Sequence, residues 1–141
     1  MLNIGGLNTG IVIDHIEAGV GMKIYSYLHL DDLDNSVAII KNARSNKMGR
    51  KDIIKIEGMI DVDLDMLGVL DANITINIIK DGVIQTKKNP NLPTEVTNII
   101  KCKNPRCITS IEQEIPHIFK LTNRQKGMYR CIYCEQAFKK R

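Results

Sequence analysis

Aromatic residues and long apolar runs are scarce in this 141-residue sequence. It contains no tryptophan and only 4% of its residues are aromatic, so isoleucine, leucine, valine and methionine must form its apolar interior. No apolar run approaches the ~20 residues that a membrane-spanning helix needs. The first residues also lack the charged and apolar regions of a secretory signal. We therefore expect a cytoplasmic protein without membrane contact, whose cysteines stay reduced rather than paired as disulfides.

The motifs of the common enzyme classes are also missing. The sequence has no Walker A motif, no GxGxxG, no HExxH and no Ser, His and Asp at an interpretable spacing. Hydrophobic residues make up 43% and charged residues 26%, an ordinary globular balance that excludes wholesale disorder. These features favour a folded, non-catalytic chain of one domain or two small ones.

Charge and cysteine are unevenly distributed along the chain. Residues 1–95 contain ten Lys/Arg and thirteen Asp/Glu, a net charge of −3, whereas residues 96–141 contain ten and three, a net charge of +7. All four cysteines lie in the second part, and two prolines mark an extended segment at residues 89–93. We therefore expect two domains, residues 1–97 and residues 98–141.

Hydrophobic periodicity predicts the elements of the first domain. β-Branched and alternating runs predict strands, whereas apolar residues spaced by four predict helices. The expected strands are residues 10–14, 37–44, 52–57, 74–79 and 83–87, and the expected helices are residues 17–28 and 61–70. Asp81-Gly82 predicts a type I′ hairpin between the last two strands. The order β-α-β-β-α-β plus one strand predicts an α+β fold, a ferredoxin-like antiparallel sheet with two helices on one face.

The four cysteines form the most specific local pattern. Four residues separate Cys102 from Cys107, two separate Cys131 from Cys134, and 23 lie between the pairs. Two such pairs can direct four sulfurs at one point, and structural Zn²⁺ prefers four thiolates at about 2.3 Å. An iron–sulfur cluster is the alternative, although the spacing argues less for it. We expect one structural zinc ion in a small β-rich domain, whose folding the metal supports because so short a segment buries little.

Polar residues elsewhere give weaker signals. Asp14 and His15 lie between a strand and a helix, where His15 could meet an anion or Asp14 could cap the helix. Residues 48–55 concentrate basic charge near a turn, which suits either an anion site or a solvated face. Lys87 and Lys88 could reach the same site or protect an edge strand from aggregation. Spacing alone does not join these residues into one site.

A zinc-ribbon module that binds nucleic acid is a rival hypothesis. The net charge of residues 96–141 favours it, as does the basic end Lys139-Lys140-Arg141, because phosphate contacts dominate such affinity. The small number of aromatic side chains available for stacking and the net acidic first domain argue against it.

Several motifs together resemble one family. They are Val12-Ile13-Asp14-His15-Ile16, Met48-Gly49-Arg50-Lys51-Asp52 with Ile53-Ile54-Lys55-Ile56-Glu57, Asn91-Leu92-Pro93, and the cysteine pattern with Tyr133 inside its last pair. Over nearly the whole chain, their order and spacing resemble the aspartate carbamoyltransferase regulatory chain. The resemblance implies a non-catalytic, allosteric regulatory subunit in pyrimidine biosynthesis, with a nucleotide-binding first domain and a zinc-binding second domain.

The resemblance also implies ligands, partners and site residues. In the family, CTP inhibits, ATP activates and UTP can act with CTP, while regulatory dimers bridge the catalytic chains that the zinc domain contacts. Matched residue by residue, the implied nucleotide site is Ile4, Asp14, His15, Lys51, Lys55, Asn77, Ile84 and Lys87. The implied contacts with the catalytic chain are Asn104 and Glu135. Gly82, Asn89 and Arg106 stand where well-known members have Tyr, Arg and Asn.

Overall fold

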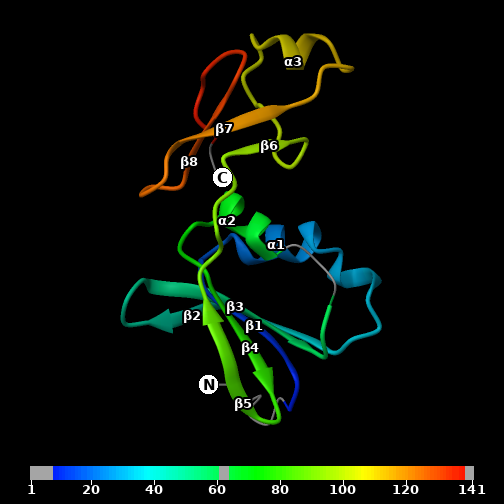
Figure 1. The fold of residues 1–141 in the computed structure, drawn as a ribbon, viewed down its shortest axis with the longest axis vertical. Helices are drawn as coiled ribbons and strands as arrows, with labels where there is room; N and C mark the ends of the chain where they lie inside the picture. The colour runs from blue at the N-terminus through cyan, green and yellow to red at the C-terminus, as the bar shows by residue number, and fades with distance from the viewer. Residues whose placement is uncertain (1–7, 61–63, 139–141) are drawn as a thin grey trace. The chain divides into compact units, whose positions relative to one another are not determined.

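The chain forms two compact units in the computed structural model, Met1–Pro90 and Asn91–Arg141, and residues 8–60 and 64–138 are described (Figure 1). The second unit begins before the boundary expected at residues 97 and 98. The reason is that strand β6 (Glu95–Thr97) pairs with β7 (Ile118–Asn123) of the second unit. Among the described residues, no helical segment has the length and the apolar character of a membrane span.

A five-stranded antiparallel sheet forms the first unit. Its strands are β1 (Gly10–Glu17), β2 (Val37–Ser45), β3 (Gly49–Glu57), β4 (Thr75–Lys80) and β5 (Val83–Lys88). Their order in the sheet is β2-β3-β1-β4-β5. The connection from β1 to β2 skips β3, and that from β3 to β4 skips β1. This is the split arrangement of the ferredoxin-like fold with β5 added at one edge, and it confirms the predicted fold class.

Two short helices cover one face of this sheet (Figure 1). They are α1 (Gly21–Tyr27) and α2 (Leu67–Leu70). Both are shorter than expected. The first begins late because β1 continues to Glu17, which pairs with Lys51 of β3. The second follows a 3-10 turn at Leu64–Met66, while residues 61–63 of the expected helix lie outside the described residues.

Isoleucines build the core between the sheet and the helices. Ile13 of β1 pairs with Ile54 of β3 and Ile76 of β4, and all three side chains are fully buried. Val20, the residue before α1, and Ile24 of α1, at the spacing of four that predicted a helix, are buried as well. Because alternate residues of a strand point to opposite faces, the residues between these isoleucines lie on the face that α1 and α2 do not cover.

A buried carboxylate ties the start of α1 to the sheet. Asp52 of β3 is fully buried, and its Oδ2 accepts hydrogen bonds from the backbone N–H groups of Gly19 at 3.1 Å and Gly21 at 3.0 Å. Its Oδ1 accepts a third from the N–H of Asn42 in β2, at 2.8 Å. A Cβ on Gly21 would lie 2.7 Å from Oδ2, so only glycine allows this approach. One buried carboxylate thus accepts three backbone hydrogen bonds from two segments.

Asp52→Asn should lower the free energy of unfolding by roughly 2–3 kcal/mol, because the new amide directs N–H groups at donors that need an acceptor. Urea denaturation of the full chain measures this loss. Asp34→Asn, at an exposed position, is the matched control and should change stability by less than about 0.5 kcal/mol. Equal stability of both variants would show that the Asp52 carboxylate does not hold the start of α1.

The second unit is small and rich in strands, as predicted. Its three-stranded antiparallel sheet has the order β6-β7-β8, where β8 is Met128–Cys131, and α3 (Ile108–Ile111) is a single short helix. Its main apolar core residues are Val96, Ile100, Phe119 and Tyr129. The Tyr129 hydroxyl donates a hydrogen bond to the carbonyl of Pro93 at 2.6 Å, which fixes the segment before β6.

Candidate functional site

The four cysteines of the second unit meet at one point. Their Sγ atoms all lie within 4.8 Å of one another. Between the two pairs, Sγ of Cys102 lies 3.6 Å from that of Cys134, and Sγ of Cys107 lies 3.7 Å from that of Cys131. Four sulfurs in a tetrahedron around Zn²⁺ would lie about 3.8 Å apart at the usual bond length. The geometry therefore fits a four-thiolate metal site, and this donor set suits structural zinc.

Hydrogen bonds with neighbouring residues position the first cysteine pair, Cys102 and Cys107. The N–H of Cys102 donates to Nδ1 of His117 at 3.0 Å, so this ring nitrogen carries no proton. The Thr109 hydroxyl donates to Sγ of Cys107 at 3.1 Å. No sequence pattern connects His117 or Thr109 with the metal, although Thr109 lies only two residues after a ligand. Both are contacts that folding creates.

The four thiols differ in their tendency to ionise in the metal-free chain. Burial raises the pKa of Cys102 to about 12, and burial also raises the pKa of Cys131. Burial of Cys107 opposes ionisation too, but hydrogen bonds outweigh it and lower the pKa of this thiol to about 7; the largest come from the hydroxyl and the N–H of Thr109, followed by those of Cys131 and Cys102. The pKa of Cys134 is also lowered, because hydrogen bonds, first that of the Asn104 side chain, outweigh burial.

The two expected contact residues for a partner lie beside this metal site. Asn104 is half-buried, and its Oδ1 accepts a hydrogen bond from the N–H of Arg106 at 3.0 Å, so its side chain also shapes the first cysteine pair. Glu135 is exposed and is one of the residues that line a hollow of about 650 Å³, together with Lys120, Arg130 and Ile132. Glu135 is thus available to a partner, whereas Asn104 is mainly engaged within the chain.

The first unit brings three of the expected nucleotide-site residues into one row. Strand register pairs Lys55 of β3 with Val12 of β1, Val12 with Asn77 of β4, and Asn77 with Lys87 of β5. Directly paired residues share a face of the sheet, and this row lies on the face opposite α1 and α2. Three strand spacings separate Lys55 from Lys87, roughly 14 Å. Among the described residues, neither ammonium group has a hydrogen bond or ion pair.

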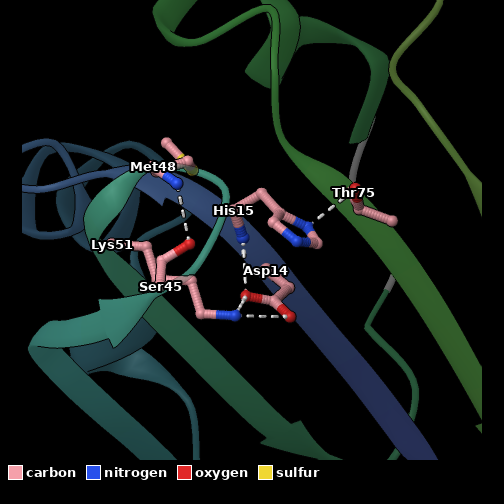
Figure 2. Close-up of polar contacts among 6 residues, drawn as sticks. All are labelled: Asp14, His15, Ser45, Met48, Lys51 and Thr75. Carbon is pink, nitrogen blue, oxygen red and sulfur yellow. Dashed lines mark hydrogen bonds and ion pairs between the residues drawn. The ribbon is translucent and has the colours of Figure 1, made fainter.

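A polar cluster lies at a bulge of β1 next to this row (Figure 2). Asp14 forms an ion pair with Lys51, with 3.0 Å between Oδ1 and Nζ. Its Oδ1 also accepts the N–H of His15 at 2.6 Å. The bulge gives His15 a positive φ of 59°, and its Nδ1 lies 3.1 Å from the Thr75 hydroxyl. The Lys51 charge is therefore already balanced, and Thr75 is a member of the cluster that sequence reasoning missed.

The remaining expected residues lie at the hairpin end of the sheet or outside the described chain. Ile84 of β5 is 56% exposed and pairs with Ile79, which shares the face of Asn77. Asp81 and Gly82 have φ values of 54° and 76°, as the predicted type I′ turn requires. Ile4 lies outside the described residues.

Comparison with known proteins identifies the family. The sequence profile for the aspartate carbamoyltransferase regulatory chain, allosteric domain, matches residues 2–91, and that for the metal binding domain of the same chain matches residues 94–141. The chain belongs to the aspartate carbamoyltransferase regulatory chain family. It is thus the non-catalytic, regulatory subunit of an enzyme of pyrimidine biosynthesis.

Individual relatives of this regulatory chain match over almost their whole length. The chain is 55% identical over 139 residues to the regulatory chain of Clostridium acetobutylicum, covering 99% of this chain and 95% of the relative. It is 52% identical over 140 residues to that of Clostridium tetani, covering 99% and 97%. The regulatory chain of Bifidobacterium longum is 41% identical over 138 residues, covering 98% and 99%. The hypothesis of a nucleic-acid-binding module finds no support in these comparisons.

Proposed function

We propose that the allosteric domain binds nucleoside triphosphates on the face of the sheet that carries Lys55, Asn77 and Lys87. CTP is the expected inhibitor, ATP the expected activator, and UTP acts together with CTP. The row itself is the main support, because it places two cations without partners among the described residues on either side of an amide. An extended polyanionic ligand with a polar base matches this arrangement of charge.

The surrounding residues suit the other parts of such a ligand. His15 and Lys87 provide positive or hydrogen-bonding groups for the triphosphate, while Asp14 and Lys55 suit the ribose and the edge of the base. The ion pair with Lys51 orients Asp14 before a ligand arrives. In this proposal Ile84, an exposed apolar side chain at the hairpin end, packs against the base.

We also propose that the metal-binding domain contacts the catalytic chain and transmits to it the effect of nucleotide binding. Its described surface exposes large apolar side chains around the cysteine site, namely Ile108, Ile111, Ile132 and Tyr133. Such side chains beside Glu135 suit an interface with another protein better than they suit water. Regulatory chains would also pair as dimers between catalytic chains. Four metal-binding thiols fit a reducing cytoplasm.

Lys55→Ala and Lys87→Ala should each weaken CTP and ATP binding by roughly 1.5–3 kcal/mol, because each removes a charge-assisted contact from a partly exposed site. Calorimetric titration with both nucleotides measures the loss, and circular dichroism verifies the fold. Lys41→Ala, an exposed lysine of the edge strand β2, is the matched control and should bind normally.

Unchanged binding in both variants would place the nucleotide site elsewhere on the chain. Absence of CTP binding in the parent chain, combined with DNA or RNA binding that falls steeply with salt, would instead favour the nucleic-acid hypothesis.

A further inference from the structure

We propose that the hydroxyl of Thr109 is a positioning group for the Cys107 thiolate and sets how strongly Cys107 holds the metal. Oγ1 of Thr109 lies 3.1 Å from Sγ of Cys107, within hydrogen-bond range for sulfur. The two side chains are 4% and 2% exposed, so water does not compete for this contact.

The local backbone fixes the partners in place. Cys107 immediately precedes α3, and its N–H donates to the Asn104 carbonyl at 3.0 Å, while its own carbonyl accepts the N–H of Ser110 at 2.9 Å. Thr109 lies in the first turn of α3, and its hydroxyl is directed back at the sulfur. A hydroxyl has one hydrogen to donate, and an anionic sulfur is the strong acceptor here. The bond therefore fixes the direction of one ligand and draws electron density from its sulfur.

Groups that hydrogen-bond to metal ligands tune both the geometry and the donor strength of the site. The other ligands have different neighbours: the backbone of Cys102 contacts His117, and the Cys134 sulfur contacts the Asn104 side chain. Thr109 thus distinguishes Cys107 from the other three sulfurs. Without its hydroxyl, the Cys107 sulfur would be a less oriented and more electron-rich ligand.

Thr109→Val replaces the hydroxyl with a methyl group of nearly the same size. In the full chain loaded with Co²⁺, we expect the sulfur-to-cobalt charge-transfer band to move to longer wavelength, because the sulfur releases its electrons more easily. Competition with a chromogenic chelator should show that Zn²⁺ binds roughly 10–100-fold more weakly, because the loss of the fixed direction of this ligand outweighs its greater electron density. Thr109→Ser keeps the hydroxyl and should restore both the band and the affinity.

Ser110→Ala is the matched control. The Ser110 hydroxyl, one residue further on, donates to the Asn104 carbonyl at 2.6 Å and not to sulfur, so its removal should leave the band in place. Thr109→Ala deletes the hydroxyl in a second way and should shift the band as Thr109→Val does. An unchanged band in both deletion variants overturns the proposal, and so does a loss of affinity that Thr109→Ser fails to restore.

Discussion

Removal of the metal is expected to unfold the metal-binding domain, residues 91–141, and to leave the allosteric domain folded. A structural zinc ion bound by cysteines contributes about 10–16 kcal/mol of apparent free energy, whereas a whole domain is typically stable by only about 5–15 kcal/mol. The described core of the second unit contains few large apolar residues, chiefly Val96, Ile100, Phe119 and Tyr129. The allosteric domain has its own isoleucine core and none of the cysteine ligands.

Elemental analysis of freshly purified, reduced protein should find one zinc ion per chain. Titration with a mercurial reagent should release that ion in proportion to the thiols consumed, since thiolates are the ligands. Hydrogen exchange followed by mass spectrometry then separates the domains. Amides of β7 and β8 should lose protection, while those of β1 and β3 keep it. Retained protection in β7 and β8 after complete metal loss would show that this domain folds without metal.

The fold of the allosteric domain was predictable because its signals are local. Alternating isoleucines predict the strands, and the Asp81-Gly82 turn predicts the hairpin, each from only a few residues. The end of β1 was not predictable in the same way. Pairing of Glu17 with Lys51 extends the strand past the bulge at His15, and this pairing joins segments far apart in the sequence. Tertiary pairing there outweighs the helical pattern that begins at residue 17.

The two candidate sites also differ in whether local sequence spacing predicts them. The metal site follows from two short cysteine spacings, and the structure confirms that the four sulfurs converge. The row of Lys55, Asn77 and Lys87 depends on strand register, which no local spacing reveals, so only the family resemblance grouped these residues beforehand. Asp52 is the clearest example of a residue whose burial its neighbours in the sequence do not predict. In a basic stretch it suggests a solvated residue, yet it is fully buried and accepts three backbone hydrogen bonds.

Cys131→Ala is expected to abolish assembly with the catalytic chain while CTP binding stays nearly intact. Cys131 ends β8 and is fully buried, and its Sγ lies 3.7 Å from Sγ of Cys107. Its replacement by alanine therefore removes one of the four metal ligands. Two exposed residues that we propose to contact the catalytic chain, Ile132 and Glu135, lie one and four residues after Cys131. The row that carries the proposed nucleotide site belongs to the other compact unit.

Allosteric control should disappear in this variant even though the effector still binds. An effector changes activity only through a difference in its affinity for two states of the assembly, and a chain that cannot join the assembly cannot bias those states. Size-exclusion chromatography with the catalytic chain measures assembly, and calorimetry with CTP measures binding on the same preparation.

Gln125→Ala, in the exposed turn between β7 and β8, is the control and should assemble normally. If Cys131→Ala still assembles, the metal-binding domain is not the docking element. If it loses CTP binding as well, the two domains are not independent, because damage at the cysteines would then have reached the sheet that carries Lys55 and Lys87.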